Sequence, residues 1–479
     1  MMNRREFLQT VGSAAAAFTL HGCSSQPPLR NTKGRDSLPH RPNVLFILAD
    51  DLGWSQIGCY GTDYYETPHL DRLAAHGMKF TDAYAACPVC SPTRASIMTG
   101  KYPARLHLTD YIAGGNFPHE KYLIPPWQKF LPLEEITLAE LFQSVGYATA
   151  SYGKWHLSIA KKPLKSLPYN PDKQGFEDHI VTYKPSSKQN PETDTHNVEL
   201  ITQKSLAFLE KNQDKPFFLY VTHNLIHNPL KGKKKRVAKF QNKPNSDRPE
   251  NNPILGAMIE ELDTSVGRLL GKLEELELVE NTIVIFFSDN GGLEKDARQT
   301  PLRSGKANLY EGGIRVPFIV RWPGVVLPGS ICREPVISVD FFATFQEIIR
   351  PKIRPRGRID GESLVGVWTQ RGSPNREALY FHYPHYHSSS LGPCSAVRAG
   401  DYKLIEWLDE RIRGEENPLE LYNLKEDLGE TNNLCGKLPQ KANELQGRLE
   451  AWRQDVGAQM LTRNPNFNPE KSRWPKAKM

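Results

Sequence analysis

The sequence predicts an α/β fold, in which a large, doubly wound and mostly parallel sheet is flanked by helices and followed by a smaller C-terminal α+β domain built on an antiparallel sheet. The first observation is a series of short apolar runs without strict alternation, which is typical of strands buried on both faces. The second is the set of amphipathic helical segments that lie between these runs. The third is a change of pattern after about residue 365, where shorter β-like runs and one polar helix follow.

The N-terminal residues 1–23 have the pattern of an export signal. Arg4-Arg5 precedes the small and apolar run Val11–Leu20, which resembles a bacterial twin-arginine signal and is too short for a stable membrane span. The signal ends in Leu-His-Gly-Cys, which resembles a lipoprotein cleavage box, so that Cys23 would carry a lipid anchor. The alternative is a soluble periplasmic protein. Residues 24–40, rich in Ser, Pro and charge, are expected to be a linker.

The remaining length and the charge limit the function classes. The 479 residues allow one large domain, 41–365, and a smaller one, 366–479. A mean hydropathy of −0.53 is typical of globular proteins and not of polytopic membrane proteins. With 61 Lys and Arg against 54 Asp and Glu, the net charge of +7 suits an anionic partner such as a sulfated or phosphorylated substrate. There is no zinc-finger spacing, heptad run or internal repeat, so we expect no nucleic-acid partner.

Four predicted strands end in polar side chains. They are Val44–Ala49, which ends at Asp50-Asp51; a run in "GYATASYGKWHL", which ends near Lys154 and His156; a run in "KPFFLYVTHNLIHNP", which ends near His223 and His227; and Ile283–Phe287, which ends at Ser288-Asp289-Asn290. In doubly wound sheets, ligands bind beyond the carboxyl ends of the strands. We therefore expect these polar side chains to gather at one edge of the sheet.

Three helices can be placed between the strands. "ITLAELFQSVG" begins with the capping box Thr137…Glu140 and ends at Gly146. "ILGAMIEELDTSVGRLLGKLEEL" repeats apolar residues at helical spacing. In "CSPTRASIMTG", Pro92 is suited to the first turn of a helix that Gly100 stops.

The acidic residues at the strand ends predict a metal site. Asp50, Asp51 and Asp289 would repel one another unless a cation lay among them, and together with Asn290 they offer only oxygen. Oxygen ligands favour a hard cation such as Ca²⁺ or Mg²⁺ over zinc. The alternative is that these residues are independent turns and helix caps.

Cys90 is predicted to lie at a helix N-terminus, where free amides and the helix dipole favour an anion. A nucleophile there can attack an anionic ester, with Arg94 one turn further on. Two alternatives are a buried cysteine near a helix cap and a redox pair with Cys87, although no thioredoxin-like context follows.

"CSPTRASIMTG" resembles the signature of the type I sulfatases of the alkaline phosphatase superfamily: Cys or Ser, any residue, Pro, a small residue, Arg, then Thr-Gly. Other family motifs follow in order, namely "ADDLGW", "GKWHL", a His before "NP", "SDNGG" and "GKANLYEGGIRVP". The resemblance extends from Arg41 to the C-terminal region. It implies that 41–365 is the catalytic domain and that a maturation enzyme converts Cys90 to formylglycine.

The resemblance also implies a role for each site residue. Asp50, Asp51, Cys90, Asp289 and Asn290 would hold one Ca²⁺, which is favoured over Mg²⁺. Formylglycine hydrates to a diol, which attacks sulfur with one hydroxyl and expels sulfate with the other. Arg94 would brace this diol, Lys154 and His156 would contact it, and His156 would be the base.

His227 and Lys306 would bind the sulfate together with Lys154, with His227 as the general acid. The family usually has Pro-His where this chain has Ile226-His227, so His223 stays an alternative acid.

The implied activity is hydrolysis of sulfate esters, most simply those of sulfated carbohydrates, in the periplasm or at the cell envelope. Two alternatives are a phosphodiesterase or phosphonate monoester hydrolase of the same fold, and a catalytically silent sugar-binding lipoprotein. His382, His385 and His387 are expected either to pack between domains or to contact sugar. The basic stretch Lys231–Lys239 suits either a solvated face or an anionic polysaccharide.

Overall fold

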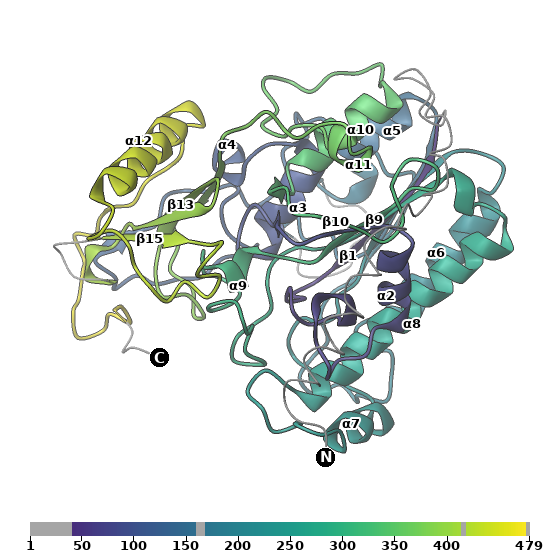
Figure 1. The fold of residues 1–479 in the computed structure, drawn as a ribbon, viewed down its shortest axis with the longest axis horizontal. Coiled ribbons are helices and arrows are strands. Elements are labelled where there is room, and N and C mark those ends of the chain that lie inside the picture. Colours follow the sequence, from purple (N-terminus) through teal and green to yellow (C-terminus); the bar gives the residue numbers. More distant parts are fainter. Residues whose placement is uncertain (1–40, 160–167, 413–417, 476–479) are drawn as a thin grey trace, which may run out of the picture. The chain divides into compact units, whose positions relative to one another are not determined.

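An eight-stranded sheet lies at the centre of the described part of the chain, which in this computed structural model comprises residues 41–159, 168–412 and 418–475 (Figure 1). The strand order is β10 (Ser330–Cys332), β2 (Met78–Phe80), β9 (Phe318–Arg321), β8 (Thr282–Ser288), β1 (Asn43–Ala49), β7 (Phe217–Thr222), β5 (Ala148–Gly153) and β6 (Asp178–Val181). Only β9 runs antiparallel to its two neighbours in this sheet. The predicted large, mostly parallel sheet is therefore confirmed. The export signal and linker expected in residues 1–40 lie outside the described residues.

The central strands are buried on both faces because helices cover each side of the sheet. One group consists of α2 (Pro68–Ala75), α6 (Val198–Lys211) and α8 (Pro253–Glu275), and the other of α3 (Cys90–Thr99), α5 (Leu138–Ser144) and α10 (Asp340–Ile349). Figure 1 shows these groups on opposite faces. In β1, Ile47 belongs to the core cluster that includes α8, whereas the ring of Phe46 packs against Phe341 of α10 at 4.9 Å. Alternate residues of this apolar strand thus pack against helices on opposite faces of the sheet.

The helix signals in the sequence coincide with the observed helices. Thr137 accepts a hydrogen bond from the Glu140 amide, and the Glu140 carboxylate accepts one from the Thr137 amide, which completes the predicted capping box of α5. α3 begins at Cys90 and is ended by Gly100, whose φ of 68° is the left-handed conformation of a helix C-cap. Further helices are α4 (Pro103–Leu106), α7 (Lys234–Gln241), α9 (Glu311–Ile314) and α11 (Val365–Trp368), with 3₁₀ turns at Gly58–Tyr60, Pro171–Lys173, Val279–Asn281 and Glu410–Ile412.

The C-terminal part contains the predicted antiparallel sheet. Its order is β12 (Leu379–Tyr383), β13 (Cys394–Ala399), β14 (Tyr402–Trp407) and β15 (Leu419–Asn423), and α12 (Pro439–Asp455) packs on it (Figure 1). Two small sheets pair β3 (Ala83–Tyr84) with β11 (Val336–Ile337), and β4 (Tyr122–Leu123) with β16 (Thr462–Arg463). Among the described residues, no helix combines the length and the apolar character needed to cross a bilayer.

Candidate active site

The acidic residues gather because β1 and β8 are parallel neighbours with matched ends. Ala49 pairs with Ser288, so Asp50-Asp51 and Asp289-Asn290 leave the sheet at the same edge. Carboxylate oxygens of Asp50, Asp51 and Asp289 lie within 4.8 Å of one another and of the Cys90 sulfur. All four side chains are almost fully buried. The register of the sheet thus concentrates three carboxylates in one place.

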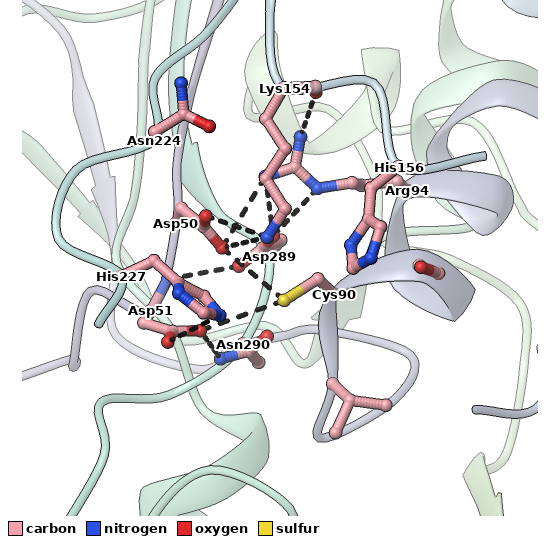
Figure 2. Close-up of polar contacts among 12 residues, drawn as sticks. Asp50, Asp51, Cys90, Arg94, Lys154, His156, Asn224, His227, Asp289 and Asn290 are labelled. Atoms are coloured by element: carbon pink, nitrogen blue, oxygen red, sulfur yellow. Dashed lines mark hydrogen bonds and ion pairs between the residues drawn. The ribbon is translucent and has the colours of Figure 1, made fainter. Parts of the chain in front are cut away.

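Cys90 is the first residue of α3 and points into this acidic group (Figure 2). Its Sγ lies 3.4 Å from Oδ1 of Asp50 and 3.9 Å from Oδ1 of Asp51, and Nζ of Lys306 lies 3.6 Å from the sulfur. Burial, together with the charge of Asp289, raises the pKa of the Cys90 thiol well above its ordinary value. Burial therefore disfavours the thiolate form of the encoded side chain.

Each carboxylate has its own cationic partner. The ammonium of Lys154 donates to both oxygens of Asp50, at 2.7 and 2.8 Å, and that of Lys306 donates to both oxygens of Asp51, at 2.6 and 2.7 Å. Arg94 binds Asp289 and also donates from Nη1 to the Lys154 carbonyl at 2.6 Å. A further Arg94 contact reaches Oδ1 of Asp50 at 3.8 Å.

These pairs set the charge states. Burial alone would raise the pKa of Asp51, but the charges of Lys306 and Lys154 lower it below the ordinary value. Burial would lower the pKa of Lys306, but Asp51 raises it above its ordinary range. The site therefore holds ionised pairs in a dry environment, where charges act strongly on any bound anion.

The two predicted site histidines have defined tautomers. His156 donates from Nε2 to the Ile112 carbonyl, and its buried Nδ1 has no partner among the described residues. His227 donates from Nδ1 to the Asn228 carbonyl at 2.7 Å, and its Nε2 lies 3.8 Å from Oδ2 of Asp51. Burial lowers the pKa of both rings well below the ordinary value, and nearby lysine charges lower it further. Both imidazoles are therefore neutral before substrate binds.

His223 lies outside this cluster. It is fully buried, and its Nε2 is 3.2 Å from the hydroxyl of Ser265 in α8. Of the two histidines that follow β7, the structure brings only His227 to the carboxylates. Asn224, which the sequence reasoning did not select, is buried next to His223 and appears in the same close-up as Asp50 (Figure 2). Its only signal in the sequence is its position at the end of a strand.

The other histidines and the basic stretch are engaged elsewhere. His382 contacts Ser395 and the Gln459 carbonyl, and His385 contacts Thr109. Both side chains are buried, which agrees with the expected packing role rather than with sugar contact. His387 stacks edge-on against Tyr111 at 5.3 Å. Several lysines of the basic stretch form ion pairs on its surface, including Lys233 with Glu261 and Lys239 with Glu66 and Glu260. Cys87 and Cys90 are both free cysteines, so the redox pair is not formed here.

The donor set fits a metal ion. Asn290 donates from Nδ2 to Oδ1 of Asp51 at 2.8 Å, and its Oδ1 is buried without a partner among the described residues. A buried amide oxygen next to three carboxylates is a ready ligand for a hard cation. The acidic cluster therefore has the chemistry of a metal site.

Comparison with known proteins identifies the family. Residues 42–349, well over half of the chain, match the family described as Sulfatase. The protein belongs to the sulfatase family. It is thus a sulfuric ester hydrolase, and its residues 305–455 match the family described as N-sulphoglucosamine sulphohydrolase, C-terminal.

Similar sulfatases extend over most of this chain. Human arylsulfatase A is 31% identical over 82% of this sulfatase and 83% of the relative. The N-acetylgalactosamine-6-O-sulfatase of Bacteroides thetaiotaomicron is 27% identical over 90% of this sulfatase and 96% of the relative. The crystal structure of Ps i-CgsB in complex with k-i-k-neocarrahexaose superposes with a TM-score of 0.73 at 25% identity, covering 89% of this sulfatase and 95% of that chain.

Proposed function

We propose that this sulfatase removes sulfate from sulfated carbohydrates, using a formylglycine made from Cys90 by a maturation enzyme and one bound Ca²⁺. The observation that carries the proposal is the position of Cys90, at the first residue of α3 and within 3.4 Å of Asp50. The names of the two most relevant relatives support the substrate class, since one is an N-acetylgalactosamine-6-O-sulfatase and the other was solved with neocarrahexaose.

The burial of Cys90 argues against the unmodified thiol as the nucleophile. A buried thiol whose pKa is raised is a weak nucleophile, so the unmodified side chain is poorly suited to attack sulfur. Formylglycine supplies a hydrated aldehyde, whose second hydroxyl allows the sulfated enzyme to release sulfate without an external nucleophile. Arg94 lies one helical turn from residue 90 and is held in place by Asp289. It contacts and stabilises the modified side chain.

The lysines and histidines bind the ester and move protons. Lys154 and Lys306, which pair with the two carboxylates beside Cys90, bind the sulfate oxygens through their ammonium groups. The unpartnered Nδ1 of His156 accepts a proton, because its Nε2 already donates to Ile112. His227 gives a proton to the leaving oxygen once the bound anion raises its pKa.

Asp50, Asp51, Asp289 and Asn290 would hold the Ca²⁺, with the modified residue 90 beside it. A divalent cation there supplies charge that polarises a sulfate oxygen and lowers the barrier to attack. We further propose that the chain is exported, and that Cys23 carries a lipid if the cleavage box is used.

The test combines mass spectrometry with an activity panel. The peptide that contains Cys90, from protein expressed with a maturation enzyme, should show loss of the thiol and gain of an aldehyde. Sulfate release should be measured on defined sulfated oligosaccharides, with phosphate and phosphonate esters in parallel. Preference for sulfate esters, lost in Cys90→Ala, supports the proposal. An unmodified thiol with no turnover favours the silent sugar-binding alternative, and preference for phosphorus esters favours the other hydrolase class.

A further inference from the structure

The turn that carries Lys306 is held by main-chain bonds to two parts of the active site. The Lys306 amide donates to the Gly292 carbonyl at 2.9 Å, just beyond Asn290, and the Ala307 amide donates to the Pro88 carbonyl at 2.8 Å, just before Cys90. Ala307 has a φ of 70°, which is a left-handed conformation that a residue with a Cβ rarely adopts. Such a conformation persists only where its surroundings hold it.

Asn308 supplies that support from a buried position. Its Nδ2 lies within hydrogen-bond distance of the Gly305 carbonyl, at 3.3 Å, and of the Lys306 carbonyl, at 3.2 Å. The same side chain reaches the C-terminal part of the chain, where Nδ2 donates to the Ser389 carbonyl at 3.0 Å and Oδ1 accepts from the Leu391 amide at 2.8 Å. One amide group therefore joins the Lys306 turn to the segment between β12 and β13.

The chain that follows the Lys306 turn is anchored at Glu311 by a buried charge cluster. Lys403 of β14 contacts Glu311 at 2.9 Å and Glu430 at 2.8 Å, and all three side chains are fully buried. The Glu311 amide also donates to Glu430 at 2.7 Å. These contacts hold the chain just after the Lys306 turn, but they do not reach the turn itself. Arg303, which precedes the turn, donates to the Tyr422 hydroxyl and the Glu430 carbonyl, whereas Asn308 contacts both the turn and the C-terminal part.

We propose that Asn308 is a positioning residue for Lys306, through which the C-terminal part of the chain holds the Lys306 ammonium between Asp51 and the side chain at position 90. The inference rests on the proposed function, in which Lys306 binds the sulfate. Lysine has four rotatable side-chain bonds, so its ammonium is placed well only if its main chain is fixed. A displacement of about 1 Å at a reacting centre costs on the order of 100-fold in rate.

The test is a double-mutant cycle on the full-length, metal-loaded enzyme with a synthetic aryl sulfate. Asn308→Ala should lower kcat at least about 10-fold. When it is combined with Lys306→Ala, the double variant should be no slower than Lys306→Ala alone. Asn433→Ala is the control, since Asn433 also accepts main-chain hydrogen bonds, from Leu421 and Cys435 at 3.0 Å each, without reaching the turn. It should leave kcat unchanged.

Several outcomes decide the matter. Asn308 does not act through Lys306 if Asn308→Ala keeps the wild-type kcat. The same conclusion follows if the fold-reduction in kcat of the double variant is the product of the two single-variant reductions. Asn308→Ser serves in the same cycle if the alanine variant fails to fold. If the wild type turns over no sulfate ester, the proposed function fails, and the cycle is then run on calorimetric binding of inorganic sulfate. Equal weakening in Asn308→Ala, Lys306→Ala and the double variant supports the positioning role, and additive weakening overturns it.

Discussion

The guanidinium of Arg94 binds a single oxygen of Asp289 through two nitrogen atoms, Nε at 2.9 Å and Nη2 at 2.7 Å. Both side chains are almost fully buried. The pair joins α3, which presents Cys90, to the end of β8, which presents Asp289 and Asn290. It therefore couples the helix of the proposed nucleophile to the strand end of the proposed metal site, and its loss is expected to affect stability as well as activity.

Replacing Arg94 by alanine should lower the free energy of unfolding by about 3–5 kcal/mol, because Asp289 would be left as a buried charge without its main partner. Urea denaturation of the metal-free protein measures this loss. The control is Arg268→Ala, which breaks the exposed pair with Glu199 and should cost less than about 1 kcal/mol. Equal losses of unfolding free energy in the two variants would show that the buried pair stabilises the fold no more than the exposed pair does.

Removal of the metal should destabilise the protein. A calcium chelator is expected to lower the thermal midpoint, and Ca²⁺ at a hundredfold excess over its Kd should restore about 2.7 kcal/mol. Asn290→Ala removes the unpartnered amide oxygen and should weaken Ca²⁺ binding in calorimetric titration. Asn433→Ala should bind Ca²⁺ like the wild type. A thermal midpoint that does not respond to Ca²⁺ would contradict the assignment of the acidic cluster.

Asp110 should make stability depend on pH between about 4 and 7. Burial raises the pKa of this carboxyl to about 7, despite hydrogen bonds from the Tyr383 hydroxyl and the Tyr111 amide. His385, 3.8 Å away, stays neutral in this range because burial lowers its pKa to about 3. The folded state therefore binds a proton that the unfolded state releases, and the free energy of unfolding falls as pH rises.

The matched variant is Asp110→Asn, which keeps an acceptor oxygen and cannot ionise. Its unfolding free energy should fall less steeply with pH than that of the wild type, by up to about 1.4 kcal/mol per pH unit in this window. Urea denaturation at a series of pH values provides the comparison. Parallel pH profiles for the two proteins would mean that the pKa of Asp110 does not differ between the folded and unfolded states.

Gly153→Ala should impair both stability and activity. Gly153 has a φ of 124°, and a Cβ there would lie 1.8 Å from the Thr222 carbonyl oxygen, which accepts from the Lys154 amide. We expect a loss of about 1–3 kcal/mol from backbone strain and a fall in kcat/KM from displaced Lys154. Gly447→Ala is the control: this glycine lies inside α12 with open space around it, so alanine should stabilise the protein by about 0.5–1 kcal/mol.

The local signals in the sequence coincide with the structure where short-range physics decides the conformation. The capping box at Thr137 and the left-handed stop at Gly100 depend on residues three or four positions apart, and both are present. The apolar run of β1 is buried on both faces because none of its side chains carries a polar group that must be solvated. The roles assigned to Cys90 and to the histidines rest on the family resemblance and remain predictions until the experiments above are done.

Contacts between distant segments were decided by the tertiary structure alone. The sequence predicted that Asp50, Asp51, Asp289 and Asn290 would leave strands at one edge, but the pairing of Ala49 with Ser288 is what brings the three carboxylates together, with Asn290 in contact with Asp51. The sequence left His223 as an alternative to His227, since both follow β7, and the structure places His223 against α8 and His227 near Asp51. The contacts of Asn308 with Ser389 and Leu391 carry no local signal at all. Periodicity and capping act over a few residues, whereas such contacts depend on how whole layers pack, and this is why the sequence determined the elements and only the fold determined their partners.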